Sequence, residues 1–142
     1  MDISLSLRTA YYNALVGQIT KNAVAIPVYD AYAIPENINY PYILLSSQTE
    51  SQRIVKRCKM FNVSILIDIV TGSIDMIGRA ESEDYAEQID NIVNPDTFVD
   101  LTMTGYTIGN TYRGESYDTT DKNQNYYIYR KLIRYNHIIS KN

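Results

Sequence analysis

The run from Lys59 to Thr71 constrains the fold more than any other part of the chain. Apolar side chains occupy every second position, and polar side chains occupy several of the positions between them. The apolar set is Phe61, Val63, Ile65, Ile67 and Ile69, and the polar set is Asn62, Ser64 and Asp68. Because successive side chains of a strand point to opposite faces, this run predicts a β-strand with one apolar face that another layer must cover.

Two amphipathic helices are predicted as that covering layer. From Ser4 to Lys21, apolar residues recur three and four positions apart, and the candidate N-caps are Asp2, Ser4 and Ser6. A second stripe runs from about residue 75 to residue 93. Gly72 precedes this second helix with Ser73 and Asp75 as candidate caps, and Asn94-Pro95 ends it.

Two further strands are predicted before the central one. Residues 25–29 are rich in β-branched and aromatic types but contain Pro27, which cannot donate a ladder hydrogen bond, so this strand is an edge strand or a strand entrance. Residues 42–47 form the next strand. The polar residues that follow lack an Asn-Gly or Asp-Gly turn, and they predict a long hairpin whose tip projects beyond the sheet.

The C-terminal third is expected to contain two more strands, at residues 98–108 and 126–139. In the second of these, apolar residues occur at both parities, which predicts either two buried faces or a β-bulge. Between them, residues 109–125 have two glycines and no aliphatic side chain, and they indicate a long polar loop or a protruding ribbon.

The resulting order is helix, three strands, helix, two strands, and we expect consecutive strands to be joined as hairpins. It predicts an α+β fold, with a mostly antiparallel sheet of about five strands and two helices packed on one face. A chain of 142 residues has the size of one domain, so we expect residues 1–142 to share a single core.

The composition excludes several classes of function. The chain has one cysteine, one histidine and a net charge of −3, which argues against a disulfide, a Cys/His zinc site and nonspecific nucleic-acid binding as the main activity. We expect no membrane segment, because no apolar run approaches the roughly 20 residues of a membrane helix. The N-terminus lacks the pattern of a signal peptide, so an unexported intracellular product is expected.

The chain contains 14 tyrosines and no tryptophan. Tyrosine joins a large apolar surface to a hydroxyl group and is enriched at protein interfaces, so this bias is typical of a chain that assembles with others. Codon bias in an AT-rich genome is an equal alternative, which would also explain the many Asn, Ile and Lys residues.

Residues with catalytic potential are few and scattered. His137 lies in the last predicted strand, where a structural role is the better interpretation. Cys58 lies between Arg57 and Lys59, whose positive charge would raise the reactivity of its thiol, but the local sequence offers no base. The second helix has acidic residues at helical spacing, which the solvated face of a helix explains better than a metal or acid/base site: Glu81, Glu83, Asp84 and Glu87. No phosphate-binding glycine motif occurs, and we expect no catalytic residues, metal or cofactor.

The predicted hairpin tip is basic. It concentrates four of the 13 Lys and Arg residues: Arg53, Lys56, Arg57 and Lys59. Such a patch suits a phosphate backbone or an acidic neighbour, and a solvated hairpin end is an equal alternative.

Three short stretches carry a resemblance to a known family. They are "IPVYD" at residues 26–30, "YPYILL" at 40–45 and the long strand "FNVSILIDIV" at 61–70, and they lie between two helices. In this order they resemble the tail-completion or tail-terminator proteins of tailed bacteriophages, over residues 5 to about 105. The matching positions are Val28, Tyr29, Asp30, Pro41, Tyr42, Ile43, Leu44 and Leu45. The AT-rich composition would fit a phage of gut bacteria, including a crAss-like one in which such a ring belongs to the neck.

The resemblance implies a structural virion protein without catalysis. Members of this family form closed rings at the head-tail joint, which connect the portal or adaptor proteins to the tail tube and surround the passing double-stranded DNA. A protein of this kind would be made in the host cytoplasm, and its partners would be further copies of itself and neighbouring neck or tail proteins. The expected interface or lumen residues lie in the hairpin tip and in the polar segment: Arg53, Lys56, Arg57, Lys59, Tyr112, Arg113 and Tyr117.

Two other functions are compatible with the residues alone. A small α+β enzyme or ligand-binding domain would bring His137, Cys58 or the carboxylates of the second helix together in a concave pocket. An adaptor domain would bind an extended peptide at an exposed sheet edge, for instance near Pro27.

Overall fold

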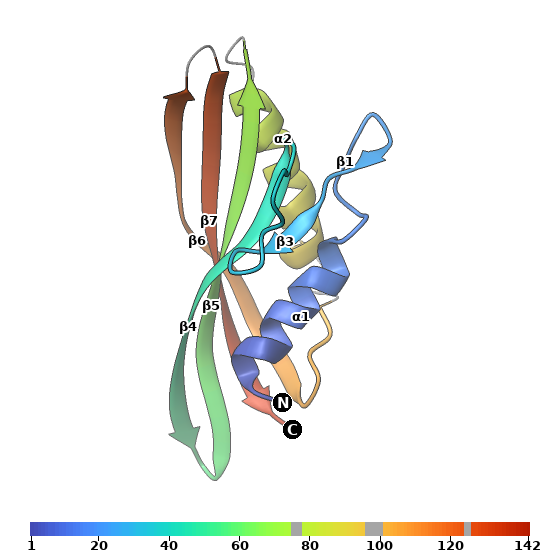
Figure 1. Cartoon of the computed structure of the whole chain (residues 1–142). Coiled ribbons are helices and arrows are strands. Elements are labelled where there is room, and N and C mark those ends of the chain that lie inside the picture. Colours follow the sequence, from blue (N-terminus) through green and yellow to red (C-terminus); the bar gives the residue numbers. More distant parts are fainter. Residues whose placement is uncertain (75–77, 96–100, 124–125) are drawn as a thin grey trace.

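A computed structural model describes residues 1–74, 78–95, 101–123 and 126–142. Figure 1 shows an elongated molecule in which long strands cross at its centre. The elements are α1 (Ile3–Leu15), β1 (Thr20–Lys21), β2 (Val24–Ala25), β3 (Val28–Asp30), β4 (Tyr42–Val55), β5 (Cys58–Ser73), α2 (Gly78–Val93), β6 (Tyr106–Asn123) and β7 (Tyr126–Lys141).

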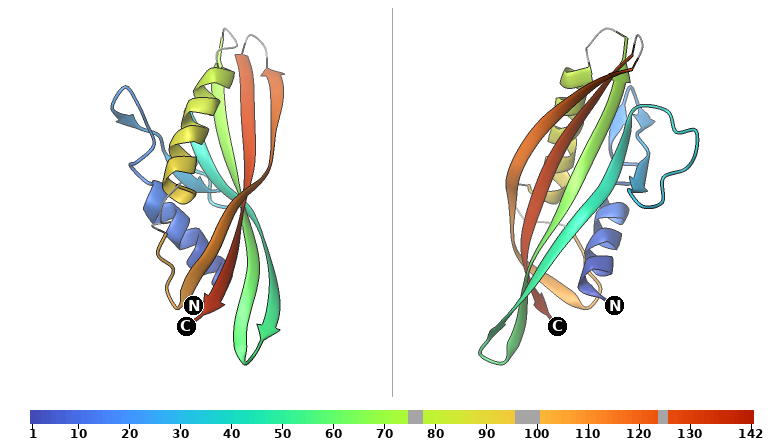
Figure 2. Two further views of the ribbon diagram at one scale, coloured as in Figure 1. Left: turned by 180° about the vertical axis from the view of Figure 1, so that it is seen from behind. Right: turned by 60° about the vertical axis from the view of Figure 1, so that its left-hand side comes forward.

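The main sheet has five strands in the order β3-β4-β5-β7-β6, and β1 and β2 form a separate two-stranded ribbon. The pairs β4-β5, β5-β7 and β6-β7 are antiparallel. Both helices lie on the same side of the sheet (Figure 2). The predicted α+β class, with a mostly antiparallel sheet and two helices on one face, is confirmed.

The connection between the first two strands of this sheet differs from the prediction. We expected consecutive strands to be joined as hairpins, but β3 pairs with β4 in parallel, with Val28 opposite Ile43. Parallel strands require a return crossing, which residues 31–41 provide, with both Pro35 and Pro41 in this connection. Pro27 immediately precedes β3, and β3 is an edge strand, as its proline predicted.

Helix α1 begins where the sequence indicates but ends earlier. Asp2 is the N-cap, and its side chain accepts a hydrogen bond from the Ser4 amide at 3.0 Å. The helix ends at Leu15 instead of Lys21, and Gly17 follows with a φ of 74°, a conformation that favours glycine. The apolar spacing continued past this point because Ile19 is also buried, although it lies outside the helix.

The alternation in β5 builds the main core. Four of its five predicted apolar residues are buried in this core with side chains of α1, α2, β4 and β7, and Phe61 is partly buried against it. Ile67 is the central example, with Leu45 beside it on β4 and Ile133 beside it on β7. The helices therefore cover the face that the sequence marked as apolar.

The prediction of a strand at residues 98–108 is wrong for most of its described length. Residues 98–100 lie outside the described part, residues 101–105 are not a strand, and β6 begins only at Tyr106. Leu101 and Met103 are nevertheless buried in the core, and this burial explains the alternation that suggested a strand. Most of the polar segment 109–125 lies in β6, which pairs with β7 along its length with two irregularities of register.

Strand β7 contributes to two clusters on opposite faces of the sheet. Ile133, Tyr135 and Ile139 belong to the main core under the helices. Ile128, of the other parity, packs against a small cluster formed by Tyr42, Leu44 and Val70. The register of β7 against β5 has no irregularity, so two buried faces, and not a bulge in β7, explain its mixed pattern.

Two tyrosine rings pack over Gly72 near one end of the sheet. Tyr40 and Tyr126 have ring centroids 6.0 Å apart, and Tyr40 also stacks on Tyr42 with centroids 5.6 Å apart. A Cβ atom at Gly72 would lie only 2.7 Å from the Tyr40 ring and 2.8 Å from the Tyr126 ring. The absence of a side chain at Gly72 is therefore what allows both rings to reach the sheet.

We expect Gly72→Ala to lower the free energy of unfolding by about 1–3 kcal/mol, because the added methyl group displaces both tyrosine rings. The matched control is Gly109→Ala in β6, where a Cβ would meet nothing closer than the Ile138 carbonyl at 3.4 Å. Urea titration of both variants measures the difference. Equal stability of the two variants would show that the packing of the Tyr40 and Tyr126 rings does not require a glycine at position 72.

Candidate assembly interface

The most prominent surface feature is a projecting ribbon, here called the arm, which comprises residues 49–59 of β4, β5 and the turn between them. All of its side chains are exposed, and in Figure 1 it extends past the chain termini at the lower end of the molecule. Pairing continues to its tip, where Val55 lies opposite Cys58, and Lys56 and Arg57 form the turn with φ values of 45° and 71°. The predicted long hairpin with a projecting end is present.

The arm is basic and also partly apolar. Arg53, Lys56, Arg57 and Lys59 form no ion pair with any residue that the structure describes. Ile54 is 75% exposed and Val55 is 36% exposed, between these cations. The tip thus exposes two apolar side chains beside four cations.

The other predicted interface residues lie elsewhere on the sheet. Tyr112 and Tyr117 are 53% and 51% exposed and pair with Asn136 and Leu132, which places them on the face without helices. Arg113 pairs with Tyr135 and lies on the helix side, 4.0 Å from the Asp90 carboxylate. The structure thus separates the predicted set into the basic arm, two tyrosines on the open face and one arginine beside α2.

Sequence reasoning missed two arginines on the open face. Arg134 donates to the Ser64 hydroxyl at 2.8 Å, and Arg130 lies 3.6 Å from the Asp68 carboxylate. Burial raises the pKa of Asp68, and the Arg130 charge partly offsets this effect. One Asp68 oxygen, Oδ1, is buried without a hydrogen-bond partner. Within each strand these residues are an even number of positions apart, which indicates that they lie on the same face. The sequence does not show which residues of β5 lie opposite which residues of β7, so it could not predict these pairs.

His137 belongs to a buried hydrogen-bond network beneath α1. Its Nε2 lies 2.5 Å from the Tyr11 hydroxyl and its Nδ1 lies 2.8 Å from the Thr111 hydroxyl. Its side chain is 1% exposed, and burial lowers the pKa of His137 to about 4. The ring is therefore neutral at pH 7, fully enclosed, and serves a structural role.

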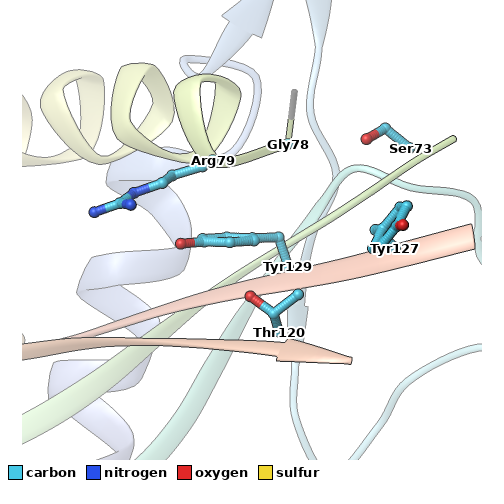
Figure 3. A pocket seen from close by; sticks show the side chains of 6 residues that line it. All are labelled: Ser73, Gly78, Arg79, Thr120, Tyr127 and Tyr129. Atoms are coloured by element: carbon cyan, nitrogen blue, oxygen red, sulfur yellow. The ribbon is translucent and has the colours of Figure 1, made fainter. Parts of the chain in front are cut away.

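The residues proposed for an enzyme site do not meet. Cys58 is exposed on the arm, whereas His137 is buried opposite Val63. The pocket in Figure 3 lies between the start of α2 and the sheet, and it contains neither residue. It is lined by Ser73, Gly78, Arg79, Thr120, Tyr127 and Tyr129, and the Arg79 and Tyr129 side chains extend along it in the same direction.

The carboxylates of α2 line a separate shallow hollow. Glu83, Glu87 and Asp90 lie there together with Arg113 and Lys131. Among the described residues, no group of three His, Cys, Asp or Glu side chains could hold a metal ion. None of the helices in the described part has the length and apolar character that a membrane crossing requires.

A structural comparison identifies a protein with the same fold. A chain of the solved virion of a native gene transfer agent particle matches with a TM-score of 0.67 at 15% sequence identity. The match covers 96% of this chain and 97% of that chain. No protein-family model matches the sequence, and no curated protein matches it. At this identity the comparison establishes the shared fold alone.

Proposed function

We propose that this chain is a structural virion protein that forms a closed ring at the head-tail joint of a tailed phage, as a tail terminator or neck ring. The observation that carries the proposal is the fold shared, over almost the whole of both chains, with a component of a gene transfer agent virion. The short motifs of a tail-terminator protein in the same chain point to the same role.

The surface has the asymmetry that a ring requires. A head-to-tail interface uses two different patches of each subunit, and it closes into a ring when the rotation between neighbours is suitable. The arm is one exposed patch, whose four cations form no ion pair with any described residue and whose Ile54 and Val55 are exposed. The exposed Tyr112 and Tyr117 on the open face offer a separate patch of a type common at interfaces, available to a neighbouring subunit or another virion protein.

The role requires assembly and no catalysis. In this proposal residues 1–142 form one tail-terminator-like domain, whose partners are further copies, portal or adaptor proteins on one side and the tail tube protein on the other. Double-stranded DNA passes through the lumen without base recognition. The contacts to these partners would be made by Arg53, Lys56, Arg57, Lys59, Tyr112, Arg113 and Tyr117.

We expect the purified protein, alone or mixed with the products of neighbouring genes, to elute as one discrete oligomer of ring size. Size-exclusion chromatography with light scattering gives its mass, and negative-stain electron microscopy shows whether it encloses a channel. A gene neighbourhood with portal, capsid and tube genes is an independent expectation. A species that stays monomeric in every mixture would contradict the proposal.

A further inference from the structure

The arm projects from the sheet without a covering surface among the residues that the structure describes. An isolated two-stranded ribbon is marginally stable in water, yet the tip residues of this one pack against no other element, and its four cations have no acidic partner in the described residues. Register places Arg53 beside Met60 and Ile54 beside Lys59, so each face of the arm carries one cation and one apolar side chain. A surface that binds it must offer acidic groups close to apolar ones.

The outer surface of α2 has these properties. Glu83, Asp84 and Glu87 are exposed, Asp84 contacts only the neutral Gln88, and Glu87 has no partner among the described residues. Glu83 pairs with Arg79 in an exposed i,i+4 contact, a type worth only a few tenths of a kcal/mol. The hollow beside these residues is lined by Glu83, Glu87 and Asp90 together with Ala86, Arg113 and Lys131. Its two cations already have acidic neighbours, Asp90 for Arg113 and Asp118 for Lys131, which leaves Glu83 and Glu87 as the acidic groups open to a partner.

The arm and this surface of α2 lie toward opposite ends of the elongated molecule (Figures 1 and 2). The arm therefore does not reach α2 of its own chain, but it can reach α2 of a neighbour placed head to tail. Contacts between unlike ends of successive copies are the heterologous type that closes into rings.

We propose that the arm of one copy docks on the acidic surface of α2 in the next copy, and that this contact joins the subunits of the ring. The inference rests on the proposed ring and adds its interface. Ile54 enters the hollow beside Ala86, and Lys59, on the same face of the arm as Ile54, faces the acidic residues of the neighbour together with Lys56 and Arg57 of the turn. Those acidic residues are Glu83, Asp84 and Glu87. A second copy suits the arm better than DNA does, because a phosphate backbone offers no apolar surface to Ile54 and Val55.

Charge inversion tests the contact directly. The triple variant Lys56→Glu, Arg57→Glu, Lys59→Glu is expected to lower the assembled fraction by at least roughly tenfold, because like charges then face each other. The inverse triple variant Glu83→Lys, Asp84→Lys, Glu87→Lys is expected to do the same. The chain that carries all six substitutions restores opposite charges and is expected to assemble again. All six residues are exposed, so each variant should fold, which circular dichroism checks.

The lone cysteine provides a second test. Cys58 is exposed on the arm, so a single Glu87→Cys variant places one thiol on each side of the proposed contact. A short bis-maleimide is expected to link this variant into a ladder of multimers, whereas wild type and a Glu36→Cys control give no ladder. Glu36 is exposed in the connection between β3 and β4.

The outcomes separate this inference from the proposed function. If wild type and the arm variant form the same ring, and the cysteine pair gives no ladder, the arm contact is wrong and the ring proposal stands. If wild type never assembles with any neighbour protein, both are wrong. If the arm variant assembles normally but loses affinity for double-stranded DNA, the arm faces the lumen and the docking inference is overturned.

Discussion

The free energy of unfolding is expected to fall by about 3 kcal/mol between pH 7 and pH 4 through His137 alone. The buried ring has a pKa of about 4 in the folded chain, against an ordinary value of 6.5 in the unfolded chain. Between these two values the unfolded chain binds a proton that the folded chain excludes, so stability falls as the pH falls. The difference of about 2.5 pH units corresponds to about 3 kcal/mol.

This prediction is checked by urea titrations at several pH values between 4 and 7, with His137→Gln as the control. The amide group keeps a polar side chain near the Tyr11 and Thr111 hydroxyls but does not titrate. The neighbouring titratable groups Tyr11, Tyr135 and Asp90 are present in both proteins, so the difference between the two pH profiles isolates the imidazole. Parallel profiles would show that His137 is not excluded from protonation.

The surroundings of His137 explain why its burial is tolerated. Both ring nitrogens have hydroxyl partners, which supply the hydrogen bonds that a buried polar group needs. The Tyr135 hydroxyl donates to Asp90 at 2.9 Å, and burial raises the pKa of Tyr135 well above its ordinary value. The Tyr11 and Tyr135 rings, with centroids 6.3 Å apart, bring these two sets of hydrogen bonds together. The contacts link α1, α2, β6 and β7, so they hold the helices on the sheet as well as satisfying polar atoms.

The sequence predicted those parts of the fold in which burial leaves a periodic pattern. β5 has one face against the helices, and its alternation identified that face correctly. β6 left no such pattern, because it is an edge strand whose partner is β7 alone and whose side chains are mostly exposed. Backbone pairing stabilises such a strand whatever its side chains are. The parallel pairing of β3 was also missed, because three residues are too few to carry a directional signal.

The same limit applies to the candidate interface. The basic residues of the arm were visible, because they are adjacent in the sequence and the hairpin is local. Tyr112 and Arg113 were expected together, but consecutive residues of a strand point to opposite faces, so β6 separates them. The pairing of Arg130 with Asp68 depends on the register between β5 and β7, which joins segments about 60 residues apart. The sequence of either strand alone does not indicate which residues of a distant strand lie opposite it.

We expect Ile67→Ala to lower the free energy of unfolding by about 2–5 kcal/mol, the range for removing a large aliphatic side chain from a packed core. Ile67 is 0% exposed and lies at the middle of β5, between Leu45 and Ile133 and beneath the helices. The cavity would open in the main core among three paired strands, so few neighbours can move to fill it. Thermal and urea unfolding measure the loss.

Ile54→Ala is the matched control, because it removes the same atoms from a side chain that is 75% exposed. Its free energy of unfolding should stay within about 0.5 kcal/mol of wild type, as for most surface substitutions. The effects on assembly should be reversed. Ile54→Ala should lower the assembled fraction because it weakens the contact between subunits, whereas folded molecules of Ile67→Ala keep an unchanged arm and should assemble as wild type does. A similar loss of stability in both variants would mean that the arm packs on its own chain and that its role as a contact between copies is wrong.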